Sequence, residues 1–414
     1  MTAVLDTRRA AAPAAPGRSR IINVLLTVLT VGLAFSITVS ELTLVVLAVV
    51  LVSGTSPDAL RRAPLTEPLL GFAAWTLLAA ATSDAPADSL RATKSLLLLA
   101  TFWIMLAALP SAAAARRFAT ALFVAVTAAA LSSIFQVLGC PPDGSYGWPS
   151  RMPVVGMYFN KCERAHAFFS IYMTLAGVLT VVLTLTLARL RGFARPALAA
   201  SAWLVGAVAL GLTLVRGAWS GFVVGAAVTL TFMRRRLLVL ALLGIFVAAA
   251  LAMPAVHRRL ETIGNPTDDT TRDRLAMLKG GLRFVREHPL TGIGPGQVKR
   301  LYPAYAPPEA LRRHTSHLHN TPLQIAVERG LVGLGLWLWI FAVFFVRAGR
   351  ILRRLPAEAA ADRALVIGAL AAVAAFLVAG LFEYNFGDTE VLLVALAVMA
   401  LPFVVERDLA ERVA

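Results

Sequence analysis

Three histidines close together are the first candidates for chemistry in this chain. His314, His317 and His319 lie within residues 312–320. A neutral imidazole can remove a proton from a hydroxyl group near pH 7, so one of them could act as a general base. A zinc site is one alternative, but no carboxylate or cysteine follows nearby to complete it. The other alternative is that all three are surface polar residues.

Arg274 is a candidate for anion binding. It lies in residues 272–288, which we expect to form an amphipathic helix. Arg274 falls at the edge of the apolar stripe of this helix, so it should point toward the protein body. There its guanidinium needs a partner, either a structural one such as Asp269 or a ligand phosphate. The expected stripe is Leu275, Leu278, Leu282 and Val285, with Arg272, Lys279, Arg283 and Arg286 opposite.

Arg216 is a second candidate, between two apolar segments with almost no connecting loop. An arginine at the end of a span could simply snorkel to the membrane surface. It could equally face a cavity, where charges at membrane depth mark function. Gly217 beside it would then permit close approach of a ligand.

The composition fixes the setting of these residues. Of 414 residues, 58% are hydrophobic and only 15% are charged, whereas soluble domains are about half apolar and a quarter charged. We therefore expect residues 1–414 to form a single all-α polytopic membrane domain. The net charge of +16 would suggest nucleic acid in a soluble protein. Here anionic membrane lipids and phosphate-bearing substrates explain it better.

Apolar runs separated by short polar breaks predict about twelve membrane-spanning helices. Basic residues cluster in alternate breaks, which places both termini in the cytoplasm, with an N-terminal tail rather than a cleaved signal. Two outer segments interrupt the pattern, residues 139–165 and the longer 254–330. The predicted spans are 21–36, 40–53, 66–82, 93–109, 118–138, 166–187, 197–214, 218–233, 237–253, 331–346, 364–381 and 390–405.

Local signals subdivide the two outer segments. Cys140 and Cys162 both fall in the first, and in an oxidising compartment they could form a disulfide or remain free thiols.

Three glycines and two prolines in residues 288–296 favour a rigid turn over a phosphate cradle. Asn320 should cap a short helix that Gly330 ends. Further charged groups on the same side are Arg91, Lys94, Arg151, Lys161, Arg164, His166, Glu383, Asp388 and Glu390.

These motifs resemble those of bacterial O-antigen ligases. His319-Asn320, nine residues and then Gly330-Leu-Val-Gly333 matches the His-Asn-x9-Gly-x-x-Gly signature of these ligases. Arg274 followed by the turn at residues 288–296, and Arg216 in its Arg-Gly-x-Trp setting, resemble the wider O-antigen ligase and polymerase superfamily. One departure is Leu278, where many members have tryptophan.

The resemblance implies a GT-C-like fold and an active site on the periplasmic face of the bacterial inner membrane. It implies inverting transfer of O-antigen from undecaprenyl diphosphate to lipid A-core oligosaccharide, with no metal and no cofactor. His319 would be the general base, and Arg216 and Arg274 would stabilise the diphosphate. The expected substrate-binding residues are Arg91, Lys94, Arg151, Arg164, His317 and Asn320.

Three alternatives to this function stay open. An O-antigen polymerase uses the same donor, and a protein-glycosylating ligase belongs to the same superfamily. A transporter of anionic lipid-linked sugars is a different class. It would need a polar path through the spans, and we find neither such a path nor the paired half-repeats common in transporters.

Overall fold

The computed structural model of the chain describes residues 16–52, 63–142, 144, 146–147, 151–152, 156–233, 237–252 and 269–413. The predicted cytoplasmic tail before residue 16 lies outside the described residues. So does the beginning of the predicted long outer loop, up to residue 268.

The described residues fold into helices and contain no β-strand. Apolar runs of this length favour helices in a membrane, because a helix satisfies its backbone hydrogen bonds internally. The helices are α1 (Pro16–Phe35), α2 (Ile37–Val52), α4 (Thr66–Ala81), α5 (Pro86–Ala92), α6 (Ala100–Ala108), α7 (Ala112–Leu138), α8 (Gly156–Phe159), α9 (Tyr172–Leu187), α10 (Pro196–Leu212), α11 (Arg216–Phe232), α12 (Leu237–Ala252), α14 (Asp269–Glu287), α15 (Val298–Tyr305), α16 (Thr321–Arg354), α17 (Ala360–Ala379) and α18 (Thr389–Val413).

The predicted spans each overlap one of these helices. Six helical stretches of the described chain are long and apolar enough to cross a membrane, and several shorter apolar helices accompany them. The chain is therefore a multi-pass membrane protein, while the number twelve stays a prediction. Several boundaries differ by six residues or more; α7, for example, begins at Ala112 instead of residue 118. The span expected to begin at residue 166 begins as a helix only at Tyr172, because residues 166–171 belong to the preceding connection.

Small residues let the central helices pack closely. α9, α11, α17 and α18 form the centre of the bundle, and residues 174–187 of α9 are all buried. A Cβ atom added at Gly221 of α11 would lie 2.5 Å from the carbonyl oxygen of Ala375 in α17. Helices in a membrane associate through such close backbone approach, because lipid offers no hydrophobic driving force between them.

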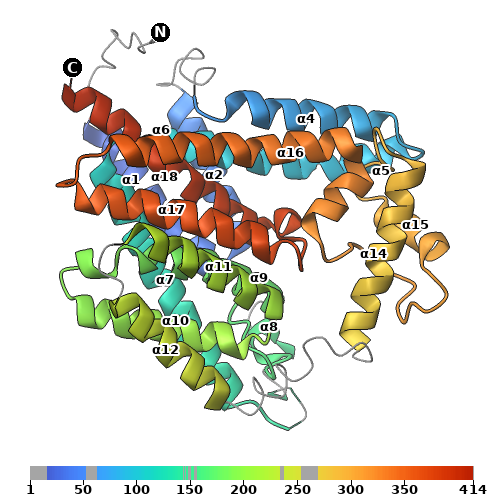
Figure 1. Cartoon of the computed structure of the whole chain (residues 1–414), viewed down its shortest axis with the longest axis horizontal. Helices are drawn as coiled ribbons and strands as arrows, with labels where there is room; N and C mark the ends of the chain where they lie inside the picture. Colours follow the sequence, from blue (N-terminus) through green and yellow to red (C-terminus); the bar gives the residue numbers. More distant parts are fainter. Residues whose placement is uncertain are drawn as a thin grey trace.

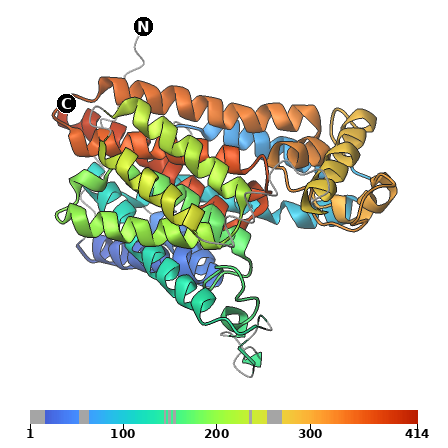
Figure 2. The same cartoon turned by 60° about the horizontal axis from the view of Figure 1, so that its bottom comes forward.

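The long helices run side by side along the long axis of the molecule (Figures 1 and 2). α14 and α15 lie at one end of this bundle, and α18 ends at the other (Figure 1). We call the end that carries α14 and α15 the loop end. α14 runs across the direction of the bundle helices rather than along it (Figure 1).

α16 is interrupted where the sequence predicts a break. Asn320 caps its start by accepting a hydrogen bond from the backbone N–H of Leu323 at 2.8 Å. Gly330 adopts a left-handed φ of 68° inside the helix. A Cβ atom at this position would lie 1.8 Å from the carbonyl oxygen of Leu290, so only glycine fits. The turn at residues 288–296 docks against this break, which confirms its predicted role as a turn.

The predicted orientation of α14 is wrong. Leu275, Leu278 and Leu282 are 52%, 40% and 56% exposed instead of facing the protein body. The helix instead packs another face against α15 and α16. This face combines small residues with a few larger side chains. In a membrane setting an apolar stripe need not point inward, and small residues permit closer packing. The buried face consists of Asp273, Ala276, Met277, Gly280, Gly281 and Phe284.

A disulfide links the two ends of the first outer segment. Cys140 and Cys162 form a disulfide with their Cα atoms 5.4 Å apart. The sequence left the disulfide and two free thiols open, and the structure has the disulfide. Cys162 is fully buried, so the bond anchors the end of the segment from which Arg164 projects.

Candidate functional site

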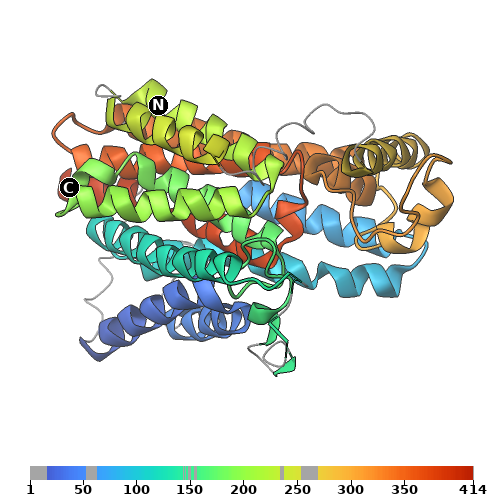
Figure 3. The ribbon, with the colours of Figure 1, turned by 90° about the horizontal axis from the view of Figure 1, so that it is seen from below.

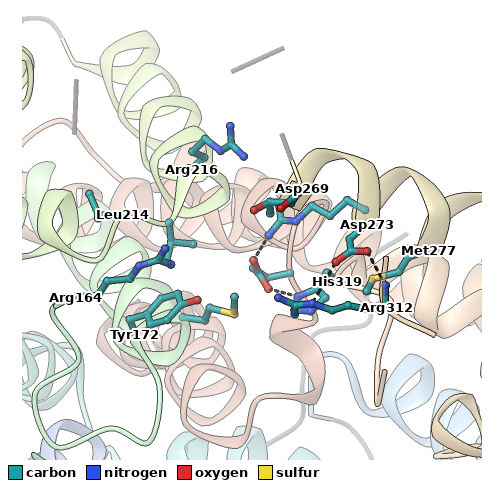
Figure 4. Close-up of a pocket in the computed structure, with 14 residues that line it drawn as sticks. Arg164, Tyr172, Leu214, Arg216, Asp269, Asp273, Met277, Arg312 and His319 are labelled. Carbon is teal, nitrogen blue, oxygen red and sulfur yellow. Dashed lines mark hydrogen bonds and ion pairs between the residues drawn. The ribbon is translucent and has the colours of Figure 1, made fainter. Parts of the chain in front are cut away.

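A cavity of about 200 Å³ lies at the loop end of the bundle. Its walls come from segments far apart in the chain, including the starts of α9, α11 and α14 and the connections before α16 and α18 (Figure 4). The lining residues are Arg164, Tyr172, Met173, Leu214, Val215, Arg216, Asp269, Thr270, Asp273, Arg274, Met277, Arg312, His319 and Glu383.

His319 reaches this cavity through an unusual backbone conformation. Its φ is 47°, a left-handed value that is uncommon for a residue other than glycine and that clusters at functional sites. The following residue, Asn320, holds it there: the Asn320 amide donates a hydrogen bond to the carbonyl of Leu381 at 2.9 Å and its oxygen caps α16. The cap of α16 therefore fixes the direction of the imidazole.

Glu383 connects His319 to Arg274. One carboxylate oxygen lies 2.7 Å from His319 Nδ1, and the other forms an ion pair with the Arg274 guanidinium. The Glu383 side chain is only 7% exposed. Because an ionised carboxylate can only accept hydrogen bonds, the imidazole proton lies on Nδ1. His319 Nε2 is then the nitrogen with a lone pair available to accept a proton.

Arg274 lines the cavity, although the stripe from which its inward direction was predicted is exposed. Its acidic partner is Glu383, not the sequence neighbour Asp269. Glu383 is itself held by Thr321, whose hydroxyl donates to the Glu383 carbonyl at 2.8 Å. The Arg274 side chain is 27% exposed, so it is partly sheltered from water while still bordering the cavity.

Arg216 is the first residue of α11 and lines the same cavity as His319 and Arg274. Figure 4 shows it above Leu214, on the wall opposite His319. The prediction that Gly217 leaves space for a ligand is wrong, because Phe382 occupies that space. A Cβ atom at Gly217 would lie 2.5 Å from the Phe382 Cβ. Glycine thus lets the start of α11 pack against the segment that carries Glu383.

Two further arginines border the cavity. The Arg164 guanidinium lies 4.5 Å from the centre of the Tyr172 ring. Arg312 is fixed by Asp273, which accepts from the Arg312 backbone N–H at 3.0 Å and lies 3.2 Å from its Nε. The described lining thus has four arginines against three carboxylates, which favours an anionic ligand.

The remaining predicted residues lie elsewhere. Arg91 is exposed and pairs with Asp88 at 2.7 Å. Lys94 and Arg151 are exposed and do not line the cavity. His317 lies behind His319, with ring centres 4.3 Å apart. Burial, and next the neighbouring His319, lower the pKa of His317 to about 4, so it is neutral at pH 7.

The three histidines of residues 312–320 do not converge with acids on one point. Among the residues that the structure describes, no group of three or more histidines, cysteines or carboxylates could hold a metal ion. A carboxylate does approach His319, but it is Glu383 from the connection between α17 and α18.

Glu383, Asp273 and Arg312 are charged site residues that sequence reasoning did not assign. Glu383 lies 64 positions from His319, in a different connection, so no local motif links them. The only signal was an acidic residue between the last two predicted spans, on the same side as Arg216. Asp273 sits beside Arg274 on a predicted helix, where an acid is ordinarily a solvated surface residue.

The profile of the O-antigen ligase family matches residues 199–338. This stretch runs from α10 into α16 and contains Arg216, Arg274 and His319. This match over about a third of the chain supports membership of the O-antigen ligase and polymerase superfamily. A search of curated proteins gave no match to the chain.

Proposed function

We propose that the protein is an O-antigen ligase. It would transfer an O-antigen glycan from undecaprenyl diphosphate to a sugar of lipid A-core, at the periplasmic face of the bacterial inner membrane. The observation that carries the proposal is a single cavity that holds a histidine oriented by a carboxylate together with Arg216 and Arg274. The superfamily consists of glycosyltransferase-like enzymes, and this arrangement suits glycosyl transfer.

His319 is the general base in this proposal. Glu383 holds the Nδ1 proton, so Nε2 accepts the proton of the acceptor hydroxyl. The acceptor oxygen attacks the anomeric carbon of the donor sugar while the bond from that carbon to the diphosphate oxygen breaks. The bonding electrons leave with the diphosphate, and the anomeric configuration inverts. Because the donor is already activated by its leaving group, no ATP is needed.

Arg216 and Arg274 stabilise the charge that grows on the departing diphosphate. Arginine suits this role because its planar fork binds phosphate oxygens in pairs. Glu383 occupies part of the Arg274 fork, and a guanidinium has five N–H donors, so donors remain for a ligand. Fixed positive groups in a water-poor site contribute several kcal/mol, about 3 kcal/mol for one donor.

Arg164 and Arg312 would bind the acceptor or the more distant phosphate of the donor. Both line the cavity, and Arg312 is held in place by Asp273. Arg91, Lys94 and Arg151 do not border the cavity and have no part in the proposed mechanism.

Reconstituted transfer tests the proposal. The purified protein is incubated with undecaprenyl diphosphate-linked glycan and lipid A-core, with and without a chelator, and the products are separated by size. A ligase yields glycan joined to lipid A-core in both conditions. Glycan chains that lengthen on the donor lipid would instead make the protein a polymerase. Movement of labelled donor across proteoliposomes without any transfer would favour the transporter.

A further inference from the structure

The outward face of α14 carries two adjoining stripes of different chemistry. The first consists of Leu275, Leu278 and Leu282, each at least 40% exposed. These leucines follow one another along the helix at spacings of three and four residues, which places them on one side. Apolar side chains gathered in this way on an exposed helix mark a surface that contacts another molecule or a membrane.

The second stripe is basic and equally exposed. Lys279 pairs with Glu309 at 2.6 Å, and Arg283 lies over the Tyr305 ring at 5.1 Å. Arg272 and Arg286 are exposed and have no ion pair with any other residue that the structure describes. These two arginines are therefore open to an anion from outside the chain.

The order of the stripes around the helix fixes their directions. At 100° per residue the leucines lie between Arg274 and the basic stripe. Arg274 turns toward the bundle cavity, whereas Lys279 and Arg283 contact the segment of α15 and the residues after it. α15 lies on the far side of α14 from the bundle (Figures 1 and 3). The leucines therefore point between these two directions, and Arg272 and Arg286 border them on the side away from Arg274.

We propose that α14 is an interfacial helix that rests on the outer leaflet of the membrane. The leucine stripe contacts the boundary of the acyl chains, and Arg272 and Arg286 bind the phosphates of anionic phospholipids. Two observations support this partner: α14 runs across the bundle direction at its loop end (Figure 1), and the charge of its outer stripe is complementary to anionic headgroups. Amphipathic helices with leucine and arginine stripes lie in a membrane interface in this way.

This placement has a consequence for the cavity. Arg274 immediately precedes Leu275 on the same helix. The contact with the bilayer would therefore hold the Arg274 guanidinium at the level of the lipid phosphates. The proposal does not depend on the reaction that the cavity catalyses.

Site-specific labelling in lipid nanodiscs tests the position of the leucine stripe. The native cysteines form a disulfide, so Leu278→Cys offers a single thiol for an environment-sensitive fluorophore. Lys299→Cys, on the exposed surface of α15, is the matched control. We expect the label at 278 to be quenched at least threefold more by lipids spin-labelled near the headgroup than the label at 299. Iodide in the water should show the reverse preference.

Equal quenching of both labels by iodide would overturn the proposal, and it would do so whether or not the protein transfers glycan. Leu282→Cys provides a second position on the stripe if the first variant does not fold. Protection of the label at 278 from iodide without any quenching by spin-labelled lipids would also overturn it, because a protein partner would then cover the stripe.

The basic stripe is tested with the same label. Spin-labelled phosphatidylglycerol and phosphatidylcholine are compared at equal mole fraction, and their quenching ratio reports which lipid gathers at α14. Each basic residue at a membrane surface adds to the attraction for anionic lipid. We expect a preference of at least threefold for phosphatidylglycerol that Arg272→Gln/Arg286→Gln reduces to near one. A preference unchanged in the double variant would contradict the role of these arginines.

Discussion

Glu383→Gln is the substitution that separates a positioned base from an isolated histidine. The amide keeps the size of the side chain but loses its charge, and its NH₂ group can donate to His319 Nδ1. The proton of the imidazole would then lie on Nε2, the nitrogen that must accept the hydroxyl proton. The same change removes the ion pair with Arg274.

The size of the effect follows from the burial of the pair. Breaking a buried ion pair by removing one partner costs about 3–5 kcal/mol, and Glu383 is only 7% exposed. If this loss falls on the transition state, at about 1.4 kcal/mol for each factor of ten, kcat falls by about 10² to 10⁴. The assay is the rate of glycan transfer by purified variant in nanodiscs, normalised to folded protein.

Glu328→Gln is the matched control. Glu328 is also a buried carboxylate, 2.7 Å from Arg329 in an ion pair, but it does not line the cavity. We expect it to lower the thermal unfolding midpoint about as much as Glu383→Gln and to leave kcat within about threefold of wild type. A Glu383→Gln variant that keeps more than a third of the wild-type kcat would refute the reasoning. So would additive losses in Glu383→Gln/His319→Ala, because groups that act as a unit are not additive.

Three further substitutions test the surroundings of the site. Arg274→Lys should lower kcat/KM at least tenfold in the transfer assay, since an ammonium cannot make paired contacts to phosphate; a fully active variant would exclude the phosphate role. Gly217→Ala should lower both the unfolding midpoint and transfer, because its Cβ would lie 2.5 Å from Phe382; an unchanged midpoint would show that the contact is not tight. Cys140→Ser removes the disulfide that joins two residues 22 positions apart and should lower the unfolding free energy by about 3 kcal/mol. Its unfolding midpoint should lie below that of oxidised wild type and match that of wild type treated with reductant. A difference between the variant and reduced wild type would show that loss of the disulfide does not explain the shift.

The elements of this fold were predictable where local chemistry decides them. Long apolar runs specified the helices, and the Asn320 cap with Gly330 specified the start and the break of α16. Both signals act within a few residues, so the sequence displays them directly. Arg216, Arg274 and His319 each stood out in their own segment, but only the resemblance to O-antigen ligases predicted that they share one site; all three line the cavity.

The contacts between distant segments were not predictable. Glu383 becomes a partner of His319 only because α16 and α17 pack so that Asn320 reaches the Leu381 carbonyl. The prediction of which face of α14 is buried was wrong for a different reason. An apolar stripe faces the core in water, but at a membrane it can face lipid, and the stripe alone does not distinguish the two. The paired glycines Gly280 and Gly281 were the better sign of the buried face.

The central claim is that His319 accepts the proton of the acceptor hydroxyl. Its most direct test is single-turnover transfer by His319→Ala, with binding of the lipid diphosphate donor measured on the same sample. We predict that transfer falls at least 10³-fold while the donor affinity stays within about threefold, since general-base catalysis contributes about 10²- to 10⁴-fold. Transfer within tenfold of wild type, with donor still bound, would contradict the account.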